Sequence, residues 1–500
     1  MIAAVIQLIS SLSKSEKRAF KLSTKKQDGE KQYVQLFDLI DKYDFRDHET
    51  LKTAFENRLP AASLDTTAQY LFQQITDSLV TAKAKSETVH KLLHGLQQVY
   101  LLKERNLTQE AYKLLLQLKK MVPPQEYLAL QYLLKREELD FYSDHDFAGL
   151  TEKVLIEHQG TARDLLRDLR NMQEHYSLYE SLKYRVTREA KQTRTDARKT
   201  DDLVLSELSM VNARVRPTLE TQQLHLLFQS FYFIHINDYK SALKTFYDLN
   251  RLFEKNPDRW KHPPIDYYAA LSGILDSLRS IKKTNEIPFY VDKLKCLCRK
   301  QYPEHFCFLI KKTALIYELA YLNDQAHYKE ATVHIAQQNK EIWEAYRFAD
   351  PEKQKELYFY IALAYFGKRN FKKAIKYVNQ VVLVKREQYL SIPYRICMLL
   401  NLLIHYELKD FEYLDYEMQS YKRIFKSNKA LSLTEQFIFK TIRINPSLNR
   451  DWKNQQLWKT KLAAQEKKIA KDRSEAVFLK YFDFVGWARA RFISGKQIAQ

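Results

Sequence analysis

The chain has 500 residues, of which 45% are hydrophobic, and this length predicts two or three domains or an elongated array that grows by stacking. Only 8 residues are glycine and 12 are proline, and because hairpins, bulges and phosphate-binding loops depend on glycine, this depletion excludes most sheet-rich and α/β folds. The formal net charge of +20 indicates either affinity for polyanions such as nucleic acid or, more simply, the charged outer faces that keep long helices in solution.

Residues 1–88 are predicted to form a helical bundle that caps the N-terminal end of a longer array. Ser13 and Glu16 have the spacing of a capping box, in which each side chain binds a free backbone N–H group at the start of a helix. Apolar residues recur at helical spacing over residues 33–40 and 64–79, which predicts two further amphipathic helices. The segment lacks the turn signature of a three-helix DNA-binding domain, so we prefer the interpretation as a cap.

Residues 89–430 are predicted to form a series of helix–turn–helix repeats. The clearest unit spans residues 357–378, where large aromatic residues flank small ones at the point where two helices would cross. The residues that define this unit are Tyr358, Ala362, Tyr365, Phe371 and Ala374. Because antiparallel helices approach closely only where small side chains lie at the crossing, the pattern predicts a tightly packed helix pair.

The same arrangement returns at other positions along the chain. The residues that define it there are Tyr239, Ala242, Phe246, Tyr328, Ala331 and Phe411. With weaker matches at Leu107, Phe147 and Ile287, successive turns lie 40 to 48 residues apart, except for one gap of 92 that accommodates a further degenerate pair. A recurring spacing of this kind is typical of helical-repeat proteins.

These repeats resemble the tetratricopeptide (TPR) family, although the family's ordinary repeat is shorter, at about 34 residues. The opening and closing blocks of the chain also resemble uncharacterised bacterial TPR-like proteins. The resemblance implies an all-α fold, an α-solenoid of antiparallel helix pairs that coil into a superhelix with a groove along it. It implies no catalytic activity and no cofactor.

Residues 431–500 are predicted to form a helical cap at the C-terminal end. Pro446 interrupts the repeats, and residues 452–473 have the composition of a long lysine-rich helix. An apolar cluster rich in aromatic residues follows over residues 478–487. We expect this cluster to cover the last open apolar face of the array, as terminal repeats must.

The sequence carries no recognisable catalytic site. No two of the 8 glycines are close enough for a Gly-x-Gly motif, which excludes the dinucleotide-binding, Walker A and nucleophile-elbow motifs. No His-Glu-x-x-His motif occurs, and His90 and His94 can share a helix face without a third metal ligand. We therefore predict a non-enzymatic protein with no metal and no cofactor.

Four cysteines are too few for a disulfide scaffold. Cys296, Cys298 and Cys307 lie among apolar residues and depart from the spacing of a zinc knuckle. We expect these three and Cys397 to be buried and reduced, which fits a reducing compartment. No apolar run approaches about 18 residues, and no basic segment precedes the apolar start of the chain, so we predict a cytoplasmic protein without a membrane span.

One segment has more closely spaced basic residues than the rest of the chain, and we call these residues the basic stripe. Within residues 163–198, which are predicted to be a long helix, basic residues recur three or four positions apart and so share a drifting face. The residues of this stripe are Arg163, Arg167, Arg170, Arg185, Arg188, Lys191, Arg194 and Arg198. They either bind phosphate groups or an acidic protein, or they form a solvated face balanced by acids such as Asp164 and Asp168.

Two functions are compatible with these features. The first is a non-enzymatic scaffold or adaptor that binds a protein or peptide in a groove lined by the first helix of each pair. The candidate lining residues are Gln229, Tyr232, His235, Tyr360 and Lys368. The alternative is a basic helical-repeat protein that binds RNA or a ribonucleoprotein through the stripe, with an affinity that falls steeply with salt.

Overall fold

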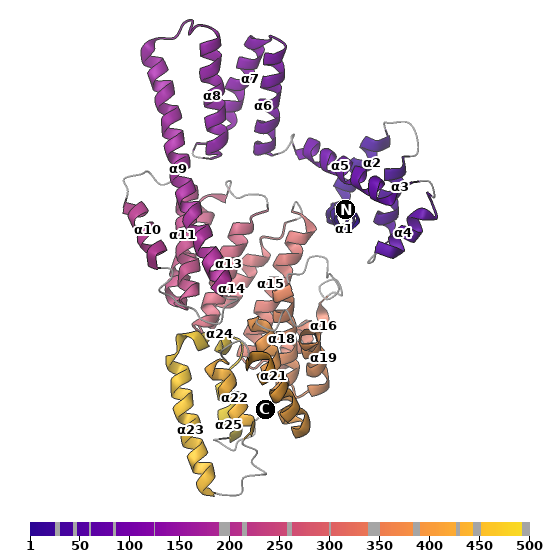
Figure 1. Ribbon diagram of the computed structural model, residues 1–500, viewed down its shortest axis with the longest axis vertical. Helices are drawn as coiled ribbons and strands as arrows, with labels where there is room; N and C mark the ends of the chain where they lie inside the picture. Colours follow the sequence, from indigo (N-terminus) through magenta and orange to yellow (C-terminus); the bar gives the residue numbers. More distant parts are fainter. Residues whose placement is uncertain are drawn as a thin grey trace. The chain divides into compact units, whose positions relative to one another are not determined.

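The computed structural model describes residues 1–25, 31–43, 48–59, 62–83, 87–124, 126–189, 201–212, 218–257, 263–299, 302–338, 351–383, 391–426, 431–443 and 452–492. Within these ranges all regular structure is helical and no strand occurs, which confirms the predicted all-α class (Figure 1). The chain divides into two compact units. The first unit comprises residues 1–177 and 210–224, and the second comprises residues 178–209 and 225–500.

The first unit begins with a bundle of short helices and continues into longer ones. Its helices are α1 (Ile2–Ser11), α2 (Lys14–Lys25), α3 (Gln32–Lys42), α4 (His48–Glu56), α5 (Leu64–Lys83), α6 (Thr88–Glu104), α7 (Thr108–Met121), α8 (Leu128–Asp144) and the first part of α9 (Glu152–Glu189). Their lengths and order follow from apolar residues that recur at helical spacing.

The N-terminal bundle encloses an apolar core between α1, α3 and α5. Its central side chains, Leu36, Phe37 and Leu71, have no exposed area. At the start of α2 the predicted capping box is formed. The Ser13 backbone N–H donates to the Glu16 carboxylate at 2.7 Å, and the Glu16 N–H donates to the Ser13 hydroxyl at 3.2 Å. Both bonds satisfy donors that the first helical turn otherwise leaves unpaired.

Close packing and a buried charge cluster hold α6, α7 and α8 together. Gly95 in α6 leaves room for Leu118 of α7, since a Cβ atom on residue 95 would lie 2.4 Å from that side chain. In α8 the Glu138 carboxylate is 2% exposed and pairs with Lys119 at 2.5 Å and Lys135 at 2.9 Å. Burial alone raises the pKa of Glu138, but hydrogen bonds from the two lysines lower it below its usual value. The carboxylate is therefore charged inside the unit.

The second unit arranges most of its helices in consecutive pairs. From α10 onward the helices are α10 (Asp201–Asn212), α11 (Leu219–His235), α12 (Tyr239–Lys255), α13 (Ile265–Ser280), α14 (Ile287–Lys295), α15 (Glu304–Asp324), α16 (Tyr328–Gln337), α18 (Pro351–Gly367), α19 (Phe371–Val382), α20 (Ile392–Glu407), α21 (Phe411–Lys426), α22 (Leu433–Arg443), α23 (Trp452–Lys471), α24 (Ala476–Leu479) and α25 (Phe484–Phe492). α13 packs on α14, α15 on α16, α18 on α19, and α20 on α21. We call α13, α15, α18 and α20 the first helices, and each also packs on the next first helix.

One type of turn recurs between paired helices. The second residue after the helix that precedes the turn has a left-handed φ of 58° to 63°. The backbone N–H of the residue that follows bonds to the carbonyl oxygen five residues before it, at 2.8 to 3.0 Å. The left-handed residues are Asn106, Asn237, Lys282, Ala326, Arg369 and Lys409. The last five are spaced 40 to 45 residues apart. Helices usually end this way on glycine, so the chain makes its turns with few glycines by placing other residues in a conformation that glycine favours.

Three of these turns begin the next helix with a polar cap. The Asp238 side chain accepts from the Ser241 backbone N–H at 3.2 Å, the Asn370 side chain from the Lys373 N–H at 3.3 Å, and the Asp410 side chain from the Tyr413 N–H at 3.3 Å. Such caps stabilise a helix by about 1 kcal/mol each. All three lie at turn positions that the sequence predicts.

The residues predicted to define the repeats differ in burial. The small residues have no exposed area: Ala242, Ala331, Ala362 and Ala374. Of the large ones, Tyr239, Phe246 and Tyr365 are buried, Tyr328, Tyr358 and Phe371 are partly buried, and Phe411 is 36% exposed. Glycine adds to the close packing at Gly273, where a Cβ atom would lie 2.2 Å from the Phe246 ring.

Candidate binding surfaces

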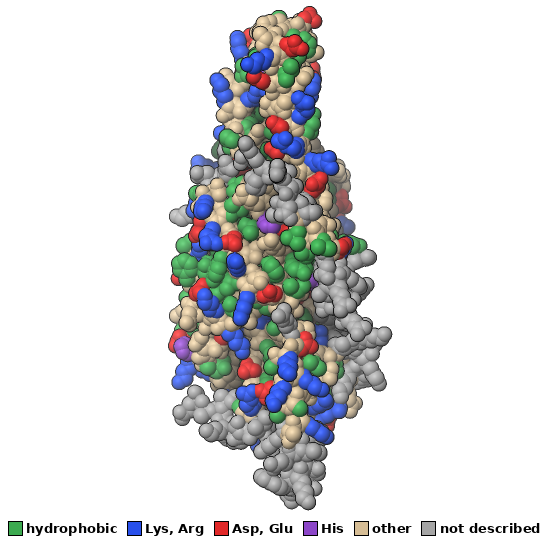
Figure 2. Space-filling model, turned by 90° about the vertical axis from the view of Figure 1, so that its left-hand side faces the viewer, with side chains coloured by type: hydrophobic (Ala, Val, Ile, Leu, Met, Phe, Trp, Pro, Cys, Tyr) green, Lys and Arg blue, Asp and Glu red, His purple; other side chains and the backbone are tan. Residues whose placement is uncertain are grey.

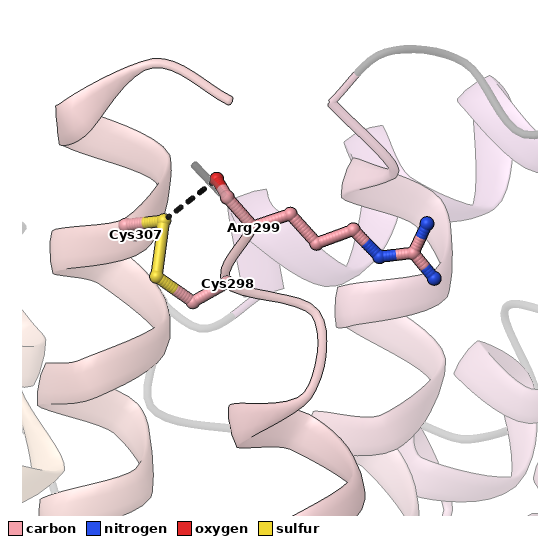
Figure 3. The surroundings of a disulfide bond; sticks show 3 residues. All are labelled: Cys298, Arg299 and Cys307. Carbon is pink, nitrogen blue, oxygen red and sulfur yellow. Dashed lines mark hydrogen bonds between the residues drawn. A yellow bond between two sulfur atoms is a disulfide. The ribbon is translucent and has the colours of Figure 1, made fainter. Parts of the chain in front are cut away.

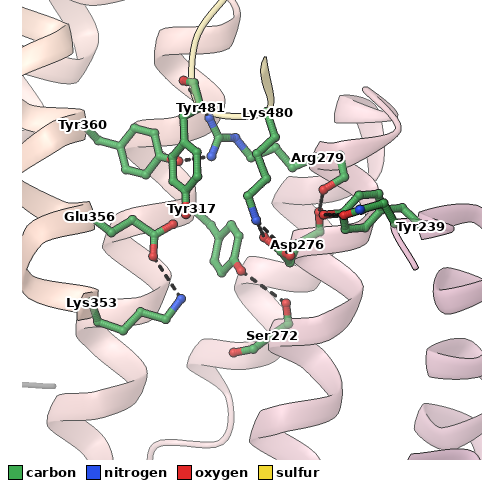
Figure 4. A network of polar contacts seen from close by, with 12 residues as sticks. Tyr239, Ser272, Asp276, Arg279, Tyr317, Lys353, Glu356, Tyr360, Lys480 and Tyr481 are labelled. Atoms are coloured by element: carbon green, nitrogen blue, oxygen red, sulfur yellow. Dashed lines mark hydrogen bonds and ion pairs between the residues drawn. The ribbon is translucent and has the colours of Figure 1, made fainter. Parts of the chain in front are cut away.

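The C-terminal segment, residues 476–492, lies on the first helices α13, α18 and α20. We call the faces of these helices that contact it the first-helix surface. The Arg279 side chain, at the end of α13, is buried at the centre of this contact (Figure 4). It donates to the Asp324 carboxylate at 3.1 Å, to the Tyr481 carbonyl oxygen at 3.3 Å, and to the Tyr360 hydroxyl. Arg279 thus joins α13, α15, α18 and the C-terminal segment.

A half-buried ion pair fixes the same segment to α13. The Lys480 ammonium donates to the Asp276 carboxylate at 2.9 Å (Figure 4). Burial alone raises the pKa of Asp276, but the Lys480 charge lowers it below its usual value. The pair is therefore ionised, and separating Lys480 from α13 would leave the half-buried Asp276 carboxylate without this partner.

Aromatic side chains of the segment fill the spaces between the first helices. The Tyr481 ring stacks on Tyr360 with 6.0 Å between ring centroids. Further along, the Trp487 ring lies 5.6 Å from Tyr406, and its indole N–H donates to the Glu407 carboxylate at 3.2 Å. The segment therefore binds at several points along α18 and α20.

The amount of buried surface makes the C-terminal segment a permanent part of the unit. The apolar side chains that it buries are Phe478, Tyr481, Phe484, Val485 and Trp487. At about 1.5 to 3 kcal/mol for each, their burial contributes on the order of 10 kcal/mol. Separating the segment from the first helices would expose these side chains to water and break the ion pair between Lys480 and Asp276, so the segment is part of the apolar core of the unit.

One expectation about this surface is therefore wrong. Tyr360, a candidate lining residue of an open groove, has no exposed area because the C-terminal segment covers it. Of the other candidates, Lys368 is exposed, with its ammonium 3.4 Å from the Thr332 hydroxyl, and Gln229, Tyr232 and His235 are half-buried on α11. The apolar cluster at residues 478–487, expected on the last face of the array, also reaches α13, more than 200 residues earlier.

A different surface of the second unit is open. Helices α14, α15 and α16 enclose a groove with a volume of about 550 Å³, which we call the α14–α16 groove. Its lining residues are Ile287, Pro288, Val291, Asp292, Glu318, Tyr321, Leu322, Lys329, Glu330, Val333, His334 and Gln337. Ile287 and Val291 are buried, whereas Val333 is 55% exposed. The volume lies in the range of binding sites, and much of the lining is apolar.

The polar groups of the groove divide into paired and unpaired ones. The Glu318 carboxylate accepts from His334 at 2.9 Å and from Lys295. Burial alone raises the pKa of Glu318, but these two hydrogen bonds lower it below its usual value. Asp292 on α14 and Lys329 on α16 are exposed, and neither forms an ion pair with another described residue.

The predicted basic stripe falls mainly on α9. Arg163, Arg167 and Arg170 are exposed, but Arg167 pairs with Asp164 and Arg170 with Glu174, both at 3.1 Å. In the second unit Arg185 binds both carboxylate oxygens of Asp202, at 2.6 and 3.0 Å, and the pairing lowers the pKa of Asp202. Arg188 ends the helix, but its side chain is outside the described residues, as are Lys191, Arg194 and Arg198.

The charge of α9 as a whole is balanced. The helix carries seven basic and seven acidic residues. On the face drawn in Figure 2, basic and acidic side chains are intermingled and do not gather by sign. Two of the exposed arginines of α9, Arg167 and Arg170, therefore have acidic partners on the same helix, and the helix as a whole adds no net charge.

The cysteines depart from the expectation that all four are buried and reduced. Cys298 and Cys307 form a disulfide that joins the chain after α14 to the first turns of α15, and the Cys307 sulfur lies 3.7 Å from the Arg299 carbonyl oxygen (Figure 3). Cys296 is exposed, and only Cys397 is buried as predicted, where burial raises the pKa of its thiol.

The described residues hold no group of three or more His, Cys, Asp and Glu side chains arranged to bind a metal ion. Across the same ranges, no helix combines the length and the apolar composition needed to cross a membrane. Comparison with protein-family models, curated proteins and solved structures finds no match to this chain.

Proposed function

We propose that this chain is a non-enzymatic, protein-binding scaffold built from TPR-like helix pairs that stack as an α-solenoid. The recurring left-handed turn, its spacing of 40 to 45 residues and the buried alanines at the helix crossings support this architecture. Helical arrays of this kind present long surfaces to protein partners.

The observation that carries the proposal is the open, largely apolar α14–α16 groove. Val333 is 55% exposed in it, which costs free energy unless another apolar surface covers it. The first-helix surface, where TPR-like proteins are expected to bind, is filled by the C-terminal segment. We therefore place the partner in the α14–α16 groove, whose walls come from α14, α15 and α16.

Binding of RNA or a ribonucleoprotein is the less favoured alternative. Phosphate binding requires basic side chains that are free to release counterions. Arg167, Arg170 and Arg185 instead pair with carboxylates, and α9 has no net charge.

Comparative affinity capture tests the proposal. The tagged full chain, its Val333→Glu variant and its Val80→Glu variant are used to capture proteins from native lysate, half of it treated with nuclease. Val80 lies on α5 and is 57% exposed, so it matches Val333 in residue type and exposure. Both variants are first checked for unchanged helix content by circular dichroism.

We expect at least one protein that wild type and Val80→Glu retain after nuclease treatment and that Val333→Glu loses. The proposal is wrong if Val333→Glu captures the same proteins as wild type. It is also wrong if all captured proteins disappear after nuclease treatment, since nucleic acid then links them to the chain.

A further inference from the structure

We infer that the ligand of the α14–α16 groove is an amphipathic helix with a basic and an acidic flank. This inference rests on the proposed function and adds the chemistry of the partner. The first argument concerns the walls of the groove. They are helices, whose backbone groups bond internally, so they cannot offer main-chain hydrogen bonds to an extended peptide.

The side chains of the groove also fail to replace those bonds. An extended peptide needs polar side chains along the groove to satisfy its own N–H and C=O groups. Glu318 and His334 bond to each other at 2.9 Å, and Glu330 pairs with His327. The remaining polar side chains of the lining are Asp292, Tyr321, Lys329 and Gln337, whereas an extended segment of only four residues has about eight backbone groups to satisfy. A helix satisfies its own backbone and needs mainly an apolar surface, which Pro288, Leu322 and Val333 provide.

The dimensions of the groove suit a short helix. The walls, α14 and α16, have 9 and 10 residues, and at about 1.5 Å of rise per residue they extend about 14 to 15 Å. A bound helix of similar length makes about two and a half turns, which places apolar anchors at positions i, i+4 and i+7 on one face.

The charges at the rim define the flanks of the ligand. Asp292 on α14 and Lys329 on α16 line the groove, are exposed, and have no ionic partner among the described residues. A helix with lysines along one flank and glutamates along the other places each flank beside the opposite charge. Because turning the helix end to end exchanges its flanks, these two residues also select its direction.

Fluorescence anisotropy with a designed probe tests the inference on the full chain. The probe is a fluorescein-labelled peptide with leucines on one helical face, lysines on one flank, glutamates on the other and alanines elsewhere. A control peptide has the same composition, shuffled so that the leucines no longer share a face. We expect the probe to bind at least about tenfold more tightly than the control, and Val333→Glu to abolish this difference.

Charge-reversal variants distinguish specific binding in the groove from non-specific binding of the peptide. Asp292→Lys and Lys329→Glu should each weaken binding of the probe by about threefold to tenfold, since an attraction becomes a repulsion. The double variant should restore the wild-type affinity, because the probe then binds in the opposite direction. A misfolded variant cannot recover in this way.

The inference is overturned if the shuffled peptide binds equally well, if neither single variant weakens binding, or if the double variant remains weak. These outcomes are distinct from failure of the proposed function. If Val333→Glu loses a captured protein but the helical probe does not bind, the proposed scaffold function stands and an amphipathic helix is excluded as its ligand. Probe binding with rescue, but without such a captured protein, would support the helix site and refute the scaffold proposal.

Discussion

Replacement of Trp487 by alanine tests how firmly the C-terminal segment is fixed. Trp487 is 3% exposed, packs on Tyr406, and donates its indole N–H to Glu407. A buried tryptophan covers about 150 to 250 Å², which at about 25 cal/mol per Å² corresponds to about 4 to 6 kcal/mol. Measured substitutions of this type cost about 3 to 5 kcal/mol, so Trp487→Ala should lower the unfolding free energy of the second unit by that amount.

Urea denaturation followed by far-ultraviolet circular dichroism measures this loss. The two units are expected to unfold as separate transitions, and Trp487→Ala should shift the midpoint of only one of them. The control is Tyr416→Ala on α21, which removes an aromatic side chain that is 64% exposed and should change stability by less than about 0.5 kcal/mol. A loss below about 1 kcal/mol for Trp487→Ala would refute the conclusion that the C-terminal segment is a permanent part of the unit.

Three further predictions concern a turn, an ion pair and the cysteines. Ala326→Gly should stabilise the second unit by about 0.5 to 1 kcal/mol in urea denaturation, because Ala326 has a φ of 58° that glycine adopts without strain. A decrease of the unfolding free energy by the same amount would contradict the left-handed conformation of Ala326. The pKa of Asp276 is lower in the folded chain than its ordinary value of about 3.9, so the ionised carboxylate stabilises the fold at pH values above that value. The unfolding free energy should therefore fall as pH drops below about 5. Asp276→Asn, which breaks the pair with Lys480, should be less stable than wild type at neutral pH and should lose less stability in acid. Alkylation followed by mass spectrometry should label Cys296 in the native, unreduced chain, and Cys397 only after unfolding. Cys298 and Cys307 should be labelled only after reduction. Labelling of all four cysteines in the unfolded, unreduced chain would exclude the disulfide.

Local features of the fold could be predicted because they depend on nearby residues. Asp238 and Asn370 mark helix starts, since a short polar side chain followed by an apolar helix is a local signal. The buried alanines could be found for the same reason, because a small residue within a large apolar pattern marks a helix crossing. The left-handed conformation of Ala326 carries no such signal, since alanine gives no indication of a positive φ.

The binding surfaces could not be predicted, because they depend on contacts between distant segments. Arg279 looks like any arginine on an amphipathic helix, and its burial follows from Tyr360 and Tyr481, which are 81 and 202 residues away. The α14–α16 groove likewise has no local signature, since its lining comes from three helices. The basic stripe on α9 had a sequence signal, but spacing alone does not show which arginines have acidic partners.

The long-range attachment of the C-terminal segment has a consequence for how the second unit folds. Helical repeats that contact only their neighbours can fray from either end and fold in steps as they are synthesised. Here Lys480 bonds to Asp276 across 204 residues, and Arg491 bonds to Glu407 across 84. These links are contacts of large sequence separation, which slow folding relative to contacts between neighbouring helices, and they connect helices α13 to α20 through one segment. The paired helices can form early on the ribosome, but their first-helix surface stays uncovered until residues 476–492 have emerged.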